Sequence, residues 1–175
     1  REVIVADVGT GSGAIAVAIG IHAPHAKIFA IDKSKEALVW AGKNIAKHKL
    51  EKQITLLQGD LLQPLKRPID IIIANLPYIP ADELQSLPKE ISKHEPYIAV
   101  NGGEDGLELY RNFSKQLPEY LSKKNNSIIV EVGAGQMIFV QEILLDNMPN
   151  YKNTQVEIHR DLRNIRRVLE IRNSN

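Results

Sequence analysis

The stretch V-I-V-A-D-V-G-T-G-S-G, residues 3–13, decides the fold. Five of its first six residues are apolar and four are β-branched, which predicts a buried strand over Val3–Val8. Three alternating glycines then allow a tight turn with positive φ and, without Cβ atoms, let a ligand approach the backbone closely. An apolar helix is expected over Ala14–His22, and the free N–H groups of its first turn suit a carboxylate or a phosphate.

Outward from this unit, strands and helices alternate along the chain. Strands are expected over 27–31, 53–57, 69–74 and 127–132, helices over 34–49, 107–123 and 136–147, and a closing pair of strands over 155–159 and 167–171. This order predicts a parallel sheet with helices on both faces, and the closing pair predicts an antiparallel hairpin. Residues 76–105 carry several prolines and glycines and are expected to form a long irregular segment, a common feature of active sites.

The composition fits one globular domain over residues 1–175. Hydrophobic residues make up 43% and charged residues 25%, and no apolar stretch approaches the roughly 20 residues that span a bilayer, so no membrane role is expected. Lys and Arg total 22 against 21 for Asp and Glu, which gives no broad case for nucleic acid as the main partner. The absence of cysteine predicts a cytoplasmic setting, and the five histidines show no metal-ligand spacing, so no metal site is expected.

Two carboxylates follow neighbouring strands. Asp32 ends the second strand about 20 residues beyond the glycines, where an acidic side chain can accept both hydroxyls of a ribose. Asp60 follows the third strand and, with Leu61, is expected to flank an adenine ring. The glycine turn also satisfies the G-x-G-x-x-A pattern of dinucleotide sites, with Ala14 last, so a nucleotide-binding module or a dinucleotide oxidoreductase stays open at this point.

The apolar run over 69–74 leads directly into Asn75-Leu76-Pro77-Tyr78, at the carboxyl end of a strand, where ligands bind in open α/β sheets. Pro77 fixes its own φ and drives Leu76 toward an extended conformation. The Asn75 side-chain oxygen and the Leu76 carbonyl can then accept both hydrogens of a substrate NH2 group, while Tyr78 offers a face to a planar group. Such bonds aim the nitrogen lone pair at a methyl carbon, and this alignment can supply several kcal/mol.

The arrangement resembles the class I S-adenosylmethionine-dependent methyltransferases, which have a Rossmann-like α/β fold with a mostly parallel seven-stranded sheet. Their first motif is D/E-x-G-x-G-x-G, and residues 7–13 match it. The resemblance implies S-adenosyl-L-methionine as the cofactor and S-adenosyl-L-homocysteine as its product. It also implies a set of cofactor-binding residues: Asp7, Gly9, Thr10, Gly11, Ser12, Gly13, Asp32, Asp60, Leu61 and Asn75.

The tetrapeptide looks like the [N/D/S]-P-P-[Y/F/W] motif of methyltransferases that act on planar amines, namely adenine N6, cytosine N4 and protein glutamine N5. This resemblance implies Asn75, Leu76, Pro77 and Tyr78 as catalytic residues. Leu76 departs from the usual proline, and N-L-P-Y is also the form seen in ribosomal RNA adenine dimethyltransferases. An RNA or DNA adenine-N6 methyltransferase, with a flipped base in the site, is therefore the alternative.

Residues 95–111 carry a longer resemblance. Glu95-Pro96, then A-V-N-G-G-E-D-G-L and Y-R, are similar to the E-P-x-x-A-L-x-G-G-x-D-G-L-x-x-Y-R of the HemK/PrmC family, as is E-V-G-A-G-Q at 131–136 to its E-I-G-x-x-Q. Asn164 stands where that family usually has glycine. The resemblance implies methylation of the glutamine N5 in the GGQ motif of peptide-chain release factors, which modulates translation termination. The family's N-terminal helical substrate-binding domain is expected to be absent from this chain, because the sequence enters a strand almost at once.

Overall fold

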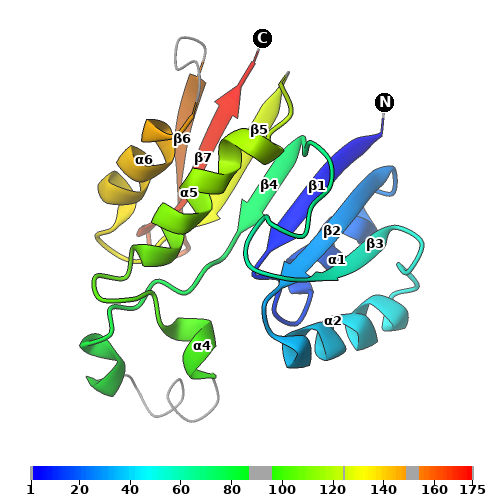
Figure 1. The fold of residues 1–175 in the computed structure, drawn as a ribbon, viewed down its shortest axis with the longest axis horizontal. Coiled ribbons are helices and arrows are strands. Elements are labelled where there is room, and N and C mark those ends of the chain that lie inside the picture. Colours follow the sequence, from blue (N-terminus) through cyan, green and yellow to red (C-terminus); the bar gives the residue numbers. More distant parts are fainter. Residues whose placement is uncertain (1, 87–95, 124, 149–153, 175) are drawn as a thin grey trace.

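The computed structural model describes residues 2–86, 96–123, 125–148 and 154–174, and it shows one seven-stranded sheet flanked by helices (Figure 1). The strands are β1 (Val3–Val8), β2 (Ala26–Asp32), β3 (Ile54–Gln58), β4 (Ile71–Ala74), β5 (Asn126–Glu131), β6 (Thr154–Arg160) and β7 (Arg166–Asn173). They lie in the order β3-β2-β1-β4-β5-β7-β6. Strands β1 to β5 pair in parallel and β7 is antiparallel to both β5 and β6, which confirms the expected sheet and its closing hairpin.

Helices cover both faces of the sheet, as expected. Figure 1 shows α5 (Glu108–Tyr120) in front of the sheet and α1 (Ala14–His22) behind it. Because successive side chains of a strand point to opposite faces, Ile4 of β1 joins the core under α5 and α6 (Met137–Asp146), while Val5 joins the core under α1 and α2 (Lys35–Lys47). In the part of the chain that the structure describes, no helix is long and apolar enough to cross a membrane.

The sheet changes its direction of growth at β1. The chain runs from β1 outward through β2 to β3 and then returns to place β4 on the other side of β1. The carboxyl ends of β1 and β4 therefore border a crevice from which the connecting segments leave in opposite directions. Ligands of open α/β sheets bind in such a crevice.

Most element boundaries lie within two residues of those expected, but the region around α5 differs. This helix was expected to reach residue 123 and ends at Tyr120, with Pro118 in its last turn. The Tyr120 carbonyl accepts the Ile69 N–H at 2.7 Å, and the Ile69 carbonyl accepts the Ser122 N–H at 2.9 Å. These bonds divert the backbone from both elements, so α5 stops early and β4 begins at Ile71 instead of residue 69.

The described parts of the segment 76–105, residues 76–86 and 96–105, are mostly irregular, as expected, but they contain a 3-10 turn η1 (Glu83–Ser86) and a short helix α4 (Tyr97–Val100). Its two ends run side by side. The Ile79 N–H donates to the Val100 carbonyl at 3.0 Å, and the Gly102 N–H donates to the Ile79 carbonyl at 2.9 Å. The segment is thereby anchored directly beyond the tetrapeptide. Glu95, where the resemblance to the loop signature begins, lies outside the described residues.

Candidate active site

The glycine turn between β1 and α1 is shaped by its neighbours. Gly9, Gly11 and Gly13 have φ values of 70°, 55° and 78°, a region that side chains with a Cβ rarely adopt. A Cβ at Gly9 would stand 3.1 Å from the Asn75 carbonyl oxygen, and one at Gly13 would stand 3.1 Å from the Ala41 Cβ. A Cβ at Gly11 would meet nothing within 4 Å. Two glycines thus allow close packing, and Gly11 leaves the backbone open to a ligand.

Asp7 holds this turn from behind. Its side chain is fully buried, and its Oδ2 accepts the Thr10 hydroxyl at 2.6 Å and the Ala16 N–H at 3.0 Å. Burial raises the pKa of the Asp7 carboxyl, while the hydrogen bonds from Thr10 and Ala16 act in the opposite direction. The carboxylate therefore links the glycine turn to the first turn of α1. Asp7 does not line the cavity in front of the turn, and neither do Thr10, Ser12 and Gly13.

Asp32, at the end of β2, is fixed by two backbone groups. Its Oδ2 accepts the Gly11 N–H and its Oδ1 accepts the Ser34 N–H, each at 2.8 Å. Ser34 is also the N-cap of α2, because its hydroxyl accepts the Ala37 N–H at 3.2 Å. Each carboxylate oxygen keeps a further lone pair, so both can still accept a hydroxyl. The geometry fits the expected contact with the two hydroxyls of a ribose.

One cavity of about 660 Å³ opens in front of these residues, a volume typical of pockets for small ligands. It runs past the ends of β1, β2, β3 and β4. The residues expected at the site that line it are Gly9, Gly11, Asp32, Asp60, Leu61, Asn75, Leu76 and Pro77. The lining also includes Trp40 and the turn at Tyr97, which the sequence did not single out. The donor and acceptor set fits an adenosyl group: a carboxylate for the ribose, an open glycine backbone and apolar walls.

The tetrapeptide joins this cavity through its first three residues. Asn75 is exposed and its side chain makes no hydrogen bond to the described residues, so its amide is available to a ligand. Leu76 is only 3% exposed and its side chain packs toward Gly9. Leu76 stands where related methyltransferases usually have proline. Burial of its side chain holds this residue in place, whereas in proline the pyrrolidine ring would do so.

Tyr78 faces a different space. It lines a second cavity of about 730 Å³, together with Arg111, Gln136 and Arg167, and not the cavity that Asn75 lines. Its side chain is half-buried, and burial, followed by the nearby charge of Glu131, raises the pKa of its hydroxyl. The structure thus brings together three of the four expected catalytic residues and sets the fourth beside a neighbouring cavity.

The backbone of Tyr78 is clamped by residues that are distant in sequence. The Gln136 Nε2 donates to the Tyr78 carbonyl at 2.9 Å, while the Gln136 Oε1 accepts the Gly133 N–H at 3.1 Å. A Cβ at Gly102 would stand 2.7 Å from the Tyr78 Cα, and one at Gly106 would stand 2.3 Å from the Tyr78 carbonyl oxygen. The approach of the tetrapeptide therefore explains two glycines of the loop signature, Gly102 and Gly106. The sequence placed Gln136 only within the E-V-G-A-G-Q motif, and the fold shows that its side chain contacts the Tyr78 carbonyl.

Comparisons with known proteins agree with this geometry. Residues 1–104 match the family described as methyltransferase small domain. The chain belongs to this family. Solved structures of methyltransferases share its fold, which confirms the class I methyltransferase architecture. The structure of a Pyrococcus furiosus methyltransferase matches with a TM-score of 0.69 at 12% sequence identity, and the match covers 98% of this chain and 75% of that chain.

Relatives of this methyltransferase small domain support the resemblance drawn from residues 95–111. The release factor glutamine methyltransferase of Thermodesulfovibrio yellowstonii is 41% identical over 169 residues, or 96% of this chain and 58% of the relative. The solved release factor-specific protein-(glutamine-N5) methyltransferase of Alicyclobacillus acidocaldarius is 25% identical, with a TM-score of 0.60, and covers 100% of this chain and 82% of that chain. The chain spans about half the length of the curated relatives it matches.

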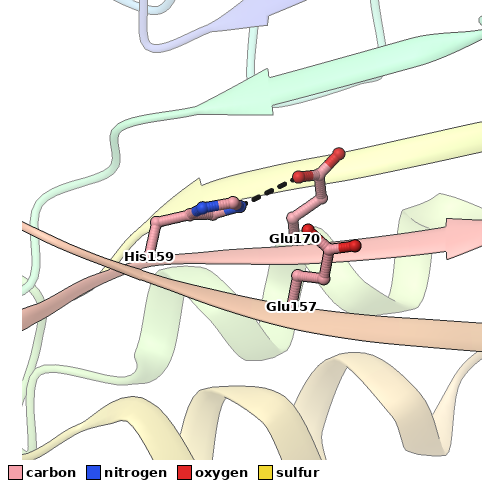
Figure 2. Close-up of side chains that lie close together, drawn as sticks. All are labelled: Glu157, His159 and Glu170. Atoms are coloured by element: carbon pink, nitrogen blue, oxygen red, sulfur yellow. Dashed lines mark hydrogen bonds and ion pairs between the residues drawn. The ribbon is translucent and has the colours of Figure 1, made fainter.

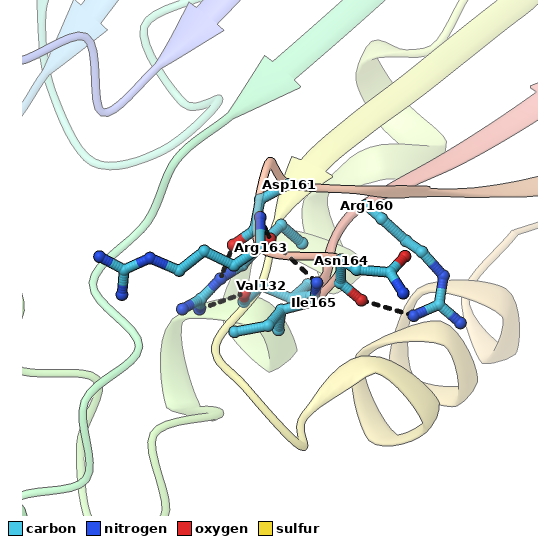
Figure 3. A network of polar contacts seen from close by, with 7 residues as sticks. Val132, Arg160, Asp161, Arg163, Asn164 and Ile165 are labelled. Carbon is cyan, nitrogen blue, oxygen red and sulfur yellow. Dashed lines mark hydrogen bonds and ion pairs between the residues drawn. The ribbon is translucent and has the colours of Figure 1, made fainter.

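The turn between β6 and β7 explains how this methyltransferase small domain accommodates Asn164, where the HemK/PrmC family usually has glycine. Figure 3 shows that Asp161 accepts the backbone N–H groups of Arg163 and Ile165, each at 2.9 Å. Asn164 has a φ of 63°, a conformation that glycine adopts readily and that asparagine tolerates better than most residues. The Arg160 guanidinium donates to the Asn164 carbonyl at 2.6 Å. Asparagine in place of glycine therefore preserves the turn.

A cluster on β6 and β7 has the composition of a metal site but is held by ion pairs. Figure 2 shows Glu157, His159 and Glu170 close together, with the His159 Nε2 3.0 Å from a Glu170 oxygen. The other Glu170 oxygen accepts the Arg172 Nε at 2.5 Å, and Arg172 also lies 3.7 Å from Glu157. The hydrogen bond from Arg172 lowers the pKa of Glu170, and that from His159 adds to the effect. The ion pairs with Arg172 and the contact with His159 account for the proximity of the two carboxylates, so the cluster is structural.

Proposed function

We propose that this chain transfers a methyl group from S-adenosyl-L-methionine to the side-chain amide nitrogen of the glutamine in the GGQ motif of a peptide-chain release factor. The observation that carries the proposal is the single cavity that joins Asp32 and the glycine turn to Asn75 and Leu76. The names of the curated relatives favour a glutamine amide over an adenine as the acceptor. A cytoplasmic setting, in which translation termination is modulated, belongs to the same proposal.

The residues of β1, β2 and β3 would hold the cofactor. Asp32 accepts the ribose hydroxyls, Asp60 and Leu61 border the adenine, and the open backbone at Gly11 allows the remainder of the molecule to approach. Asp7, Thr10, Ser12 and Gly13 act indirectly, because they shape the turn without lining the cavity. When bound, S-adenosyl-L-methionine supplies an electrophilic methyl group.

The residues at the end of β4 would orient the acceptor. The Asn75 side-chain oxygen and the Leu76 carbonyl accept the two amide hydrogens, and neither group is engaged by the described residues. With both hydrogens held, the nitrogen lone pair is directed toward the methyl group, and the proton leaves during or after transfer. Tyr78 as a packing surface for the amide stays a prediction, since this side chain lines the second cavity.

A labelled methyl-transfer assay tests the function. The chain is offered a purified release factor, the same factor with its GGQ glutamine replaced by alanine, ribosomal protein uL3, ribosomal RNA and DNA. Label is expected in the intact release factor and not in its alanine variant. Ribosomal protein uL3 is included because a 40% identical relative from Bradyrhizobium diazoefficiens, matched over 75% of this chain and 41% of that protein, is named a uL3 glutamine methyltransferase. Label in nucleic acid alone would replace the proposal by the adenine-N6 alternative.

The role of Asn75 is tested by Asn75→Ala. The substitution removes one of the two acceptors for the amide hydrogens, so turnover is expected to fall by about 10²- to 10³-fold. Affinity for S-adenosyl-L-homocysteine, measured by calorimetry, is expected to change by only a few-fold because Asp32 and the glycine turn remain. Asn147→Ala, at an exposed asparagine that follows α6, is the matched control. Turnover of Asn75→Ala at the level of this control would show that Asn75 does not orient the acceptor.

A further inference from the structure

The rim of the cofactor cavity carries large apolar side chains that solvent reaches. Trp40 of α2 is 60% exposed, and Tyr97 and Ile98 of α4 are 66% and 56% exposed. All three line the same cavity as Asp32 and the glycine turn. Exposed aromatic side chains leave a large apolar area in water, and their gathering around a concave site indicates a surface that a ligand covers.

Trp40 lies on the face of α2 that borders the cavity. Glu36 and Ala37 line the cavity as well, and residues three and four positions apart share one face of a helix. Helix α2 starts beside Asp32, because the Ser34 N–H that opens it donates to the Asp32 Oδ1. Trp40 lies six residues beyond the N-cap Ser34, or about 9 Å along the helix axis, so a base attached to a ribose at Asp32 has this face of α2 beside it.

The indole of Trp40 makes a cation–π contact with Lys43. The Lys43 Nζ lies 4.1 Å from the centre of the Trp40 ring, a cation–π contact that restricts its rotation. Lys43 does not line the cavity, whereas Trp40 does. The cation–π contact therefore does not place the ammonium among the residues that line the cavity. A planar, uncharged aromatic ring suits an exposed indole that borders a concave site.

We propose that Trp40 is a cofactor-contacting residue whose indole packs on the purine of the bound adenosyl group, with Tyr97 and Ile98 covering the same mouth from the opposite wall. The inference rests on the proposed function, because it requires an adenosyl cofactor in this cavity. It adds a contact that sequence motifs do not assign, and it explains why a tryptophan is left exposed. Stacking between a base and an aromatic side chain typically contributes about 5- to 100-fold to binding.

The experiment uses the fact that Trp40 is the sole tryptophan of the chain, so its fluorescence reports this position alone. The protein is titrated with S-adenosyl-L-homocysteine, with adenosine and with homocysteine, and binding is measured in parallel by calorimetry. S-adenosyl-L-homocysteine and adenosine are expected to change the emission at the midpoint of their calorimetric binding curves, and homocysteine is not. Quenching by acrylamide, strong in the free protein, is expected to fall when S-adenosyl-L-homocysteine is bound.

Variants separate stacking from general effects. Trp40→Ala is expected to weaken S-adenosyl-L-homocysteine binding by about 5- to 100-fold, and Trp40→Phe to restore much of the loss. Val39→Ala is the matched control, because Val39 is 53% exposed on the same helix and does not line the cavity. Thermal unfolding checks that each variant is folded.

The outcomes distinguish the two proposals. Calorimetric binding of S-adenosyl-L-homocysteine with unchanged emission and unchanged acrylamide quenching would overturn the role of Trp40 and leave the proposed function intact. Equal affinities of Trp40→Ala and Val39→Ala for S-adenosyl-L-homocysteine would likewise overturn the role of Trp40 and leave the proposed function intact. Absence of calorimetric binding by the wild-type chain would overturn both.

Discussion

Replacing Gly106 by alanine is expected to displace the tetrapeptide. A Cβ at this position would stand 2.3 Å from the Tyr78 carbonyl oxygen and 2.6 Å from the Gln136 Nε2. Ordinary van der Waals contact begins near 3.4 Å, so the Tyr78 carbonyl would have to move by about 1 Å. A shift of this size carried along the backbone to Leu76 and Asn75 would misplace the groups that orient the acceptor, which can cost about 10²-fold in rate. The loss would come from geometry alone, since Gly106 lines neither cavity.

Gly135→Ala provides the control for backbone strain. Gly106 and Gly135 have φ values of 73° and 84°, where an L-residue costs about 1–2 kcal/mol. A Cβ at Gly135 meets nothing within 4 Å, so this variant carries the strain without the collision. Both variants are expected to lose about 1–2 kcal/mol of unfolding free energy. Gly106→Ala is expected to lose about 1–3 kcal/mol more, the usual cost of overpacking.

Three measurements separate these effects: urea unfolding, labelled methyl transfer to the release factor, and calorimetric titration with S-adenosyl-L-homocysteine. Only Gly106→Ala is expected to lose turnover, and it is expected to keep affinity for S-adenosyl-L-homocysteine within a few-fold. If both variants lose turnover equally, or if Gly106→Ala turns over like the wild type, the contact with Tyr78 does not set the catalytic geometry.

Two further changes test other contacts. Gln136→Leu removes the hydrogen bond to the Tyr78 carbonyl and the one from the Gly133 N–H. The variant is therefore expected to lose about 1–3 kcal/mol of unfolding free energy in urea, and its turnover is expected to fall more than its cofactor affinity. An unchanged unfolding free energy would count against the role of Gln136 in holding Tyr78. Glu170 has a folded pKa below its ordinary 4.5 because of Arg172, so its contribution to stability is present above pH 4.5 and is lost as pH falls through the lowered pKa. Glu170→Gln is expected to flatten that part of the stability–pH curve, and an identical curve would exclude this ion pair as the cause.

The sequence predicts the fold well because the decisive signals are local. A β-branched run before alternating glycines places β1, its turn and α1, and the remaining strands follow from short apolar runs separated by helical periodicity. The predicted end of α5 was wrong by three residues. The observed end depends on backbone hydrogen bonds that Ile69 makes with Tyr120 and Ser122, which are distant from it in sequence. No local pattern contains that contact.

The residues that line the cavity could be predicted where a motif coincides with the end of a strand. They could not be predicted where lining the cavity depends on the direction of a side chain. Asp32 and Asn75 reach one cavity because the carboxyl ends of parallel strands meet at one edge. Asp7 turns away from the cavity because alternate residues of a strand face opposite sides, and its partners are Thr10 and Ala16. Trp40 could not be predicted from the sequence, because an exposed position on a helix acquires a role only when the fold places it beside a cavity.

The contact between Gly9 and the Asn75 carbonyl also affects how the site moves. With room for less than one methyl group between them, the glycine turn and the segment that begins at Asn75 are expected to shift together when β1 and β4 fluctuate. Under the proposed function, this coupling would keep the separation between methyl donor and acceptor nearly constant. A side chain gained at position 9 would therefore require a compensating rearrangement 66 positions away in the sequence.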